Sequence, residues 1–196
     1  SNDLSSSLDY LRSLIGNIRK VLRDATGLQK TKFIDLHGDR YVLDPGLVDA
    51  DVWRFQTELA ASSADGQPKI EALTEVGVQY GGDLVEGCSY GWVEAMREDL
   101  RRRAVDVYVE IADLHDRAGD YTQTLDGLES AVRVDPYCED LYRRIMQIND
   151  QLKRPDAVQR TYRLLEKRLT ELDADPSKET EALLRRLTAR PASVPA

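Results

Sequence analysis

The sequence predicts a mainly α-helical protein in which stacked helical hairpins form an α-α superhelix, preceded by a small unit with a β-hairpin. Three observations predict this fold class: apolar residues recur with a helical period along most of the chain, a 34-residue self-similarity runs through residues 104–172, and β-prone runs are confined to residues 32–44. The chain has 196 residues, of which 41% are hydrophobic and 32% charged. This composition can bury a core and disfavours wholesale disorder.

The first predicted element is an amphipathic helix near residues 6–25. Ser6 or Ser7 can cap its start, and Gly27 suits the left-handed position after its end. The opposite face is polar and basic. The apolar residues that recur at the helical period are Leu8, Leu11, Leu14, Ile15, Ile18, Val21, Leu22 and Ala25.

The second predicted element is a short β-hairpin. The runs "KFIDL" and "RYVLD" are β-prone, and "HGD" separates them. Gly38 and Asp39 form a plausible tight turn, and Pro45 with Gly46 ends the second strand.

Helices follow the hairpin. Val52, Phe55 and Leu59 lie on one face of a helix that Asp49 or Asp51 can cap. A loop at residues 61–68 separates this helix from a second one at residues 69–80, which "YGGDLVEG" ends. A long helical stretch then begins at Trp92.

The long helical stretch contains an internal repeat. Comparison of the chain with itself at an offset of 34 residues aligns apolar with apolar, and a 34-residue helix-turn-helix period resembles tetratricopeptide (TPR) repeats. The aligned pairs are Tyr108–Tyr142, Ile111–Ile145, Leu114–Ile148, Ala118–Leu152 and Leu128–Tyr162. The predicted helices are residues 104–118, 121–134, 138–152 and 156–172.

Small residues are expected where these helices cross, at Ala112, Gly127, Ala131 and Ala157. In the second copy Lys153 stands where the first has Gly119. A terminal helix follows, capped by Ser177 or Asp175, and residues 191–196 are expected to be a disordered tail.

Charge is unevenly distributed. The formal net charge is −8, yet residues 1–43 hold seven basic and five acidic side chains and sum to +2. The remainder, with 20 basic and 30 acidic side chains, sums to −10. Because an acidic body repels nucleic acid, any DNA contact is expected in the first segment.

Several function classes are disfavoured. No nucleophile-base pattern or phosphate-binding loop occurs, so an enzyme is not expected, and neither is a cofactor. His37 and His115 are too few for a metal cluster, and Cys88 and Cys138 lack zinc or disulfide spacing. No apolar run is long enough for a membrane span, and the first residues lack a signal-peptide pattern, so a cytoplasmic location without membrane contact is expected.

Specific segments carry a family resemblance. The segments "VDADVWRFQ", "YGGDLVEGCSYGW", "REDLRRRA", "AGDY", "DPYCEDLYRRIM" and "RPDAVQRTYRLLEKRL" resemble the bacterial transcriptional activator domain of SARP-type regulators. Upstream, "LRSLIGNIRKVL" followed by "GDRYVLDP" resembles the last helix and wing of an OmpR-type winged helix-turn-helix. The resemblance implies a partial winged helix at residues 1–45 and a TPR-like activator domain at 46–190. It also implies that the chain is a fragment of a longer regulator.

The resemblance assigns the basic helix as a recognition helix and the hairpin as its wing. Such a helix reads base edges through polar side chains while arginine and lysine neutralise phosphates. The alternative is a solvated polar face, which most amphipathic helices have. The candidate DNA-binding residues are Arg12, Ser13, Asn17, Arg19, Lys20, Arg23, His37 and Arg40.

Two functions are therefore expected. The first is a fragment of a transcriptional regulator, which contacts DNA only in the full-length protein and whose helical domain binds a protein partner or itself. The second is an interaction or scaffold module of a signalling protein that does not bind DNA. Aromatic side chains can line a peptide groove on the helical part, although at these spacings they are more often core. They are Trp53, Phe55, Tyr80, Trp92, Tyr108, Tyr121 and Tyr142.

Overall fold

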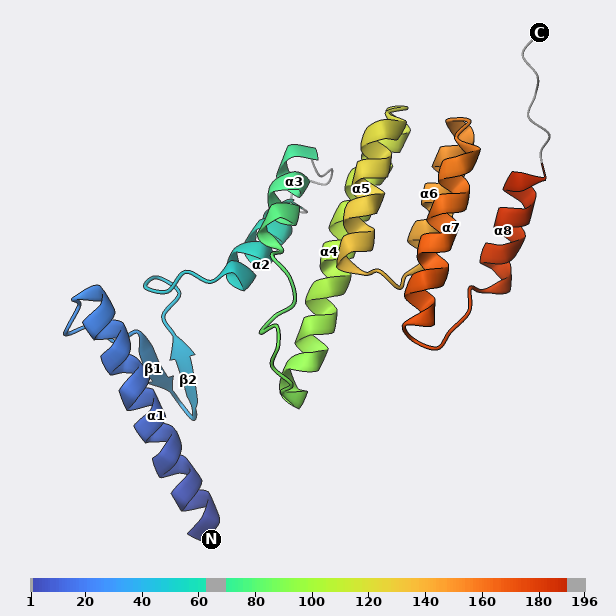
Figure 1. The fold of residues 1–196 in the computed structure, drawn as a ribbon. Helices are drawn as coiled ribbons and strands as arrows, with labels where there is room; N and C mark the ends of the chain where they lie inside the picture. Colours follow the sequence, from blue (N-terminus) through green and yellow to red (C-terminus); the bar gives the residue numbers. More distant parts are fainter. Residues whose placement is uncertain (1, 63–69, 190–196) are drawn as a thin grey trace. The chain divides into compact units, whose positions relative to one another are not determined.

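The computed structural model describes residues 2–62 and 70–189, with side chains from residue 6 onward. Most of the loop expected at residues 61–68 and the expected tail at 191–196 lie outside this range. The chain divides into two compact units, residues 1–54 and 55–196. Eight helices and one two-stranded sheet occur in the described residues, so the predicted mainly α-helical class is confirmed (Figure 1).

The first unit is a long helix packed on a hairpin. Helix α1 spans Asn2–Thr26, so the predicted cap at Ser6 or Ser7 is wrong, because the helix continues through the serines. It ends as predicted at Gly27, which has a φ of 73° and donates its N–H to the carbonyl of Arg23. The hairpin and helix share a small buried cluster, formed by Ile15, Phe33 and Ile34.

The hairpin has the predicted strands and turn. Strand β1 (Ile34–His37) pairs antiparallel with β2 (Arg40–Leu43), and the register places His37 opposite Arg40. Gly38 and Asp39 form the two-residue turn, with Gly38 at a φ of 65°, a conformation that glycine adopts without strain.

Helices α2 (Asp51–Ser62) and α3 (Ile70–Gln79) precede the repeats. On α2 the face predicted from Val52, Phe55 and Leu59 places Phe55 in the core, where its ring meets that of Tyr80 at a centroid distance of 6.0 Å. Helix α3 packs on the long helix α4 (Gly91–Arg117), whose Tyr108 hydroxyl donates to the Gly77 carbonyl at 2.9 Å.

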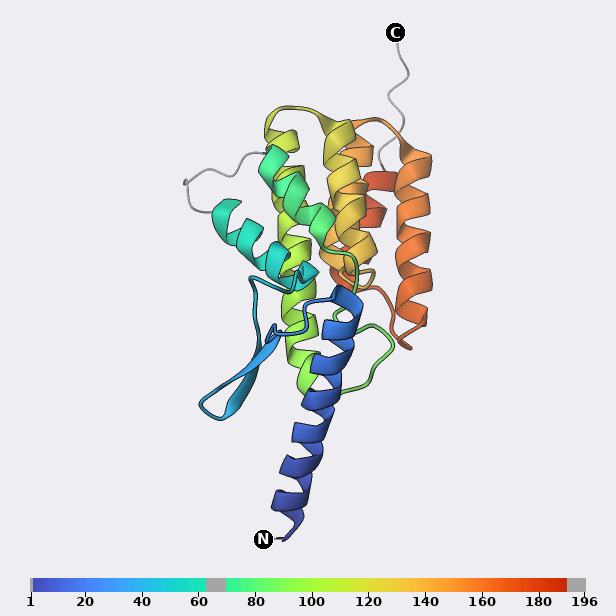
Figure 2. The ribbon, with the colours of Figure 1, turned by 90° about the vertical axis from the view of Figure 1, so that its left-hand side faces the viewer.

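The repeats form two stacked hairpins and a terminal helix. Helices α5 (Tyr121–Val134), α6 (Glu139–Gln151) and α7 (Pro155–Thr170) lie within a few residues of their predicted bounds. Helix α8 (Lys178–Thr188) packs on α6 and α7. In Figures 1 and 2, α5 and α7 lie on the same side of the row that α4 and α6 form. The TPR-like arrangement of helical hairpins is therefore confirmed.

Small residues permit a close crossing of α4 and α5, as predicted. Ala112 and Ala131 are fully buried, and a Cβ added to Gly127 would lie 3.1–3.2 Å from the Cβ, Cα and backbone N of Ala112. Ala157 is only partly buried. The turn between α6 and α7 repeats the turn between α4 and α5: Lys153 adopts a φ of 58°, close to the 76° of Gly119. Lysine thus occupies a left-handed position that glycine would occupy with less strain.

Candidate functional site

The basic face predicted on α1 divides into two groups in the structure. Arg19 and Arg23 turn toward the hairpin segment. The Arg19 guanidinium donates twice to the Ile34 carbonyl, at 2.9 and 2.7 Å, and lies 5.9 Å from the centroid of the Tyr41 ring. Arg23 donates to the Thr31 carbonyl at 3.0 Å. These two arginines therefore fix the hairpin segment against the helix.

The remaining candidates are exposed. Ser13, Asn17 and Lys20 are spaced by four and three residues, so they form one row along the helix surface. Arg12 forms an ion pair with Asp9 at 3.0 Å. At the tip of the hairpin His37 and Arg40 are both exposed. The structure thus brings three of the eight candidates into one exposed polar row and assigns two others to packing.

Helix α1 also exposes apolar side chains on another face. Their relative exposures range from 39% for Leu14 to 68% for Tyr10. They recur at the helical period, so they form a continuous row. The members of this apolar row are Tyr10, Leu11, Leu14, Ile18 and Val21.

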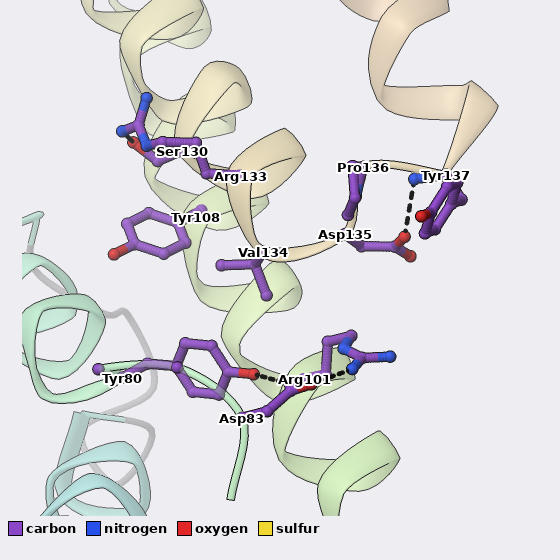
Figure 3. A pocket seen from close by; sticks show the side chains of 12 residues that line it. Tyr80, Asp83, Arg101, Tyr108, Ser130, Arg133, Val134, Asp135, Pro136 and Tyr137 are labelled. Carbon is purple, nitrogen blue, oxygen red and sulfur yellow. Dashed lines mark hydrogen bonds and ion pairs between the residues drawn. The ribbon is translucent and has the colours of Figure 1, made fainter. Parts of the chain in front are cut away.

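The second unit contains a hollow of about 470 Å³ between the α3–α4 loop, α4 and the C-terminal end of α5 (Figure 3). Tyr80, Asp83 and Arg101 line one end, and Arg133 and Ser130 line the other. Arg133 is exposed and donates to the Ser130 hydroxyl at 2.7 Å. The hollow therefore combines aromatic surface with the guanidinium groups of Arg101 and Arg133 and the carboxylates of Asp83 and Asp135, so it offers ring faces and both signs of charge to a peptide.

Three side chains at one end of this hollow are coupled. The Tyr80 hydroxyl donates to Asp83 at 3.1 Å, and Arg101 contacts the same carboxylate at 2.5 Å. Burial, followed by the charge of Asp83, raises the pKa of Tyr80 to about 12. The hydrogen bond to Asp83 raises the pKa of Arg101. Tyr80 stays neutral and Arg101 charged at physiological pH, so Tyr80 is a donor rather than a base.

Arg97 holds the loop that carries Asp83. The Arg97 guanidinium, only 14% exposed, donates to three backbone carbonyls and forms an ion pair with Glu94 at 2.6 Å. The carbonyls are those of Leu84, Val85 and Cys88, at 3.0–3.2 Å. A planar guanidinium can satisfy several carbonyls at once, which a lysine ammonium on a flexible stem cannot do in the same geometry.

Arg97→Lys should therefore loosen residues 81–90 while the repeats remain folded. We expect amide hydrogen exchange in this loop to rise about tenfold, since one or more hydrogen bonds to a charged donor are lost at roughly 1.5–3 kcal/mol each. Arg102→Lys is the control, because Arg102 is exposed and pairs only with Asp99 in the described chain. Equal exchange in the two variants would contradict the role assigned to Arg97.

The aromatic residues considered from the sequence divide between core and surface. Phe55 and Tyr142 are buried, and Tyr80 and Tyr108 line the hollow. Trp92 is 73% exposed and stacks on Tyr90, so the core interpretation is wrong for this residue, which lies in the first turn of α4. The sequence pattern did not reveal Asp83, Arg97 or Arg101, because their partners are backbone carbonyls and side chains of a loop without periodicity.

The described part of the chain contains neither a membrane-spanning helix nor a cluster of metal ligands. No helix in residues 2–62 or 70–189 combines the length and apolarity needed to cross a bilayer. Within the same residues, no group of three or more His, Cys, Asp and Glu side chains could hold a metal ion.

The stacked hairpins and the lined hollow define a TPR-like helical domain, a class of fold that generally presents surfaces to protein partners. Comparison with known families gives the particular assignment. Residues 50–188, more than two thirds of the chain, match the bacterial transcriptional activator domain, and the chain belongs to this family. Neither a curated protein nor a solved structure matches the chain.

Proposed function

We propose that the chain is part of a cytoplasmic, SARP-type transcription regulator in which the helical unit binds protein and the N-terminal unit belongs to a DNA-binding winged helix. The observation that carries the proposal is the family match over residues 50–188. The partner of the helical unit is a second copy or a component of the transcription apparatus. The role is a binding role, without catalysis.

The contacts of the first unit support its assignment as a recognition helix and wing. Arg19 and Arg23 fix the hairpin segment on α1 through carbonyls, as a wing must be held on its helix. Ser13, Asn17 and Lys20 remain exposed in one row with the chemistry that reads bases and neutralises phosphate. The apolar row of α1 fits the packing surface of further winged-domain elements, so DNA binding is proposed for the longer protein.

A second candidate function is an interaction module that does not bind DNA. The observation that favours it is that three arginines of the basic face already have partners within the chain. Arg19 and Arg23 donate to carbonyls of the hairpin segment, and Arg12 forms an ion pair with Asp9. Lys20 is then the single basic member of the exposed row formed with Ser13 and Asn17. Few phosphate contacts would leave such a helix with weak affinity for DNA.

DNA binding by the full-length regulator separates the two candidates. Duplexes selected from a random pool by the full-length protein would be titrated by fluorescence anisotropy at several salt concentrations. We expect Lys20→Ala to weaken binding to all sequences and to reduce the salt slope by about 1, because one phosphate contact is lost. Asn17→Ala should instead cost about 1–3 kcal/mol on the selected sequence and relax specificity at one base pair.

Lys30→Ala serves as the control, because Lys30 is exposed but lies in the loop after α1. Full-length protein that selects no sequence, or whose binding is unchanged by both α1 substitutions, would favour the interaction module. The 196-residue chain by itself is expected to bind the selected duplexes weakly, since its net charge is −8.

A further inference from the structure

The outward faces of α5 and α7 carry opposite charges at equivalent positions of the repeat. Asp126 and Glu129 of α5 correspond, at the 34-residue offset, to Arg160 and Arg163 of α7. All four side chains are exposed, and α5 and α7 lie on the same side of the helical unit (Figures 1 and 2). One face therefore presents an acidic row beside a basic row.

The side chains of the two charged rows form no ion pair within the described chain, and Arg163 donates a hydrogen bond to the amide oxygen of its helix neighbour Gln159 at 3.4 Å. Neither Asp126 nor Glu129 forms an ion pair in the residues that the structure describes, and the same holds there for Arg160 and Arg163. By contrast, the arginines of α4 and α6 have carboxylate partners, for example Arg101 with Asp83 and Arg144 with Asp113. Lys167, four residues after Arg163, extends the basic row, and Lys153 and Arg154 are exposed in the turn before α7; none of the three forms an ion pair among the described residues.

The charge reversal extends beyond these rows. Residues 71–140 hold six basic and 17 acidic side chains, whereas residues 141–170 hold eight basic and three acidic. Between the rows a hollow of about 480 Å³ has apolar lining from Val132, Pro136 and Leu164, of which Leu164 is 45% exposed. The charged side chains of Glu129, Arg133 and Arg168 also line it. The face thus has apolar surface between two rows of opposite charge, the arrangement of an interface with a polar rim.

We propose that this face binds a second copy of the chain as a two-fold dimer in which α5 of each protomer lies opposite α7 of its partner. In a two-fold interface residue i contacts residue j of the partner and j contacts i. The acidic row of each protomer then meets the basic row of the other, so both pairs of rows are satisfied. The proposal rests on the proposed function, in which a second copy is one of the two partners of the helical unit, and it identifies the surface that this copy would bind.

The rival occupant of the basic row is nucleic acid. The same face carries Asp126 and Glu129, and the surrounding residues 71–140 are strongly acidic, so phosphate would be repelled on the α5 side. A second copy satisfies both rows, whereas DNA satisfies only the row on α7. The charge pattern therefore favours the dimer.

The test uses two charge-reversal variants of the 196-residue chain in sedimentation velocity over a concentration series. Asp126→Lys/Glu129→Lys makes both rows basic, and Arg160→Glu/Arg163→Glu makes both acidic. Each variant should dimerise with a Kd raised about 100-fold, because like charges then face each other. An equimolar mixture of the two variants should regain a dimer, since every basic row again meets an acidic one.

The control is Glu71→Lys/Glu75→Lys, which makes the same change in net charge as Asp126→Lys/Glu129→Lys but at exposed positions of α3, and it should leave the wild-type Kd unchanged. The wild-type dimer should weaken as salt is raised to about 0.5 M, where exposed charges are screened. Circular dichroism melts of each variant check that the fold is retained.

A wild-type chain that stays monomeric, a mixture that fails to associate, or equal effects of the control and the row variants would overturn the proposal. So would duplex DNA binding that Arg160→Glu/Arg163→Glu abolishes in a monomeric chain. These outcomes leave the proposed function itself testable, because DNA selection by the full-length regulator and binding of another protein do not depend on this dimer.

Discussion

Gly127→Leu should lower the free energy of unfolding of the helical unit by about 3 kcal/mol. A Cβ at this position would already lie 3.2 Å from the backbone N and Cα of Ala112. Backbone atoms of a packed helix cannot move aside as the end of a flexible side chain can, so the larger leucine must push α5 away from α4. Urea denaturation followed by far-UV circular dichroism measures the effect.

The control for this substitution is Gln123→Leu, which places the same side chain at an exposed position of α5 and should change stability by less than about 0.5 kcal/mol. Equal stability of the two variants would show that the α4–α5 crossing can widen at little cost. Gly127→Ala is a finer probe, because alanine gains about 1 kcal/mol of helix propensity while its methyl group meets the same close contact.

Glu139→Ala should detach α8 from the repeats and destabilise the unit by about 2–3 kcal/mol. The Glu139 carboxylate, on α6, accepts hydrogen bonds from the backbone N–H and hydroxyl of Ser177, at 3.0 and 2.8 Å, and from the hydroxyl of Thr180 at 2.6 Å. Ser177 is the N-cap of α8 and also accepts the Thr180 N–H. One carboxylate therefore anchors the first turn of α8, and its loss leaves the buried Thr180 hydroxyl without this acceptor.

The same carboxylate predicts a pH dependence. Burial raises the pKa of Glu139. The hydrogen bonds from Thr180 and Ser177, together with the charge of Arg143, lower this pKa by more than burial raises it, so the net shift is downward from 4.5. A group whose pKa is lower in the folded state stabilises the fold above its unfolded pKa and loses that contribution as the pH falls through the folded pKa. The wild-type advantage over Glu139→Gln should thus be complete near neutral pH and shrink in acid.

Thermal melts of both proteins from about pH 7 down to about pH 3 measure this difference. Glu179→Gln is the control, because Glu179 is 77% exposed and lies 3.7 Å from Arg143 at the edge of the same cluster. A Glu139→Gln deficit that is constant over the whole range would contradict ionisation as its cause.

The sequence by itself determined the helical repeats, and the physical reason is local. A 3.6-residue apolar period, small residues at Ala112 and Gly127, and a cap at Ser177 all act within one helix or between neighbours in the chain. Each of these signals can therefore be recognised in one sequence without a structure, and together they predict the bounds of α5, α6 and α7 to within a few residues. The hairpin turn at Gly38 and Asp39 was equally local.

Only the tertiary structure decided which polar side chains face outward and what they meet. Arg19 and Lys20 are neighbours in sequence, yet Arg19 bonds to the Ile34 carbonyl and Lys20 is exposed, because the hairpin covers one side of α1. Arg97 donates to carbonyls of a loop, and a loop without sequence periodicity gives no signal from which these contacts could be predicted. The sequence shows that Asp126 and Arg160, 34 residues apart, have opposite charges at equivalent repeat positions. Only the stacking of the hairpins places both residues on one face, because packing between helices decides which rows lie side by side.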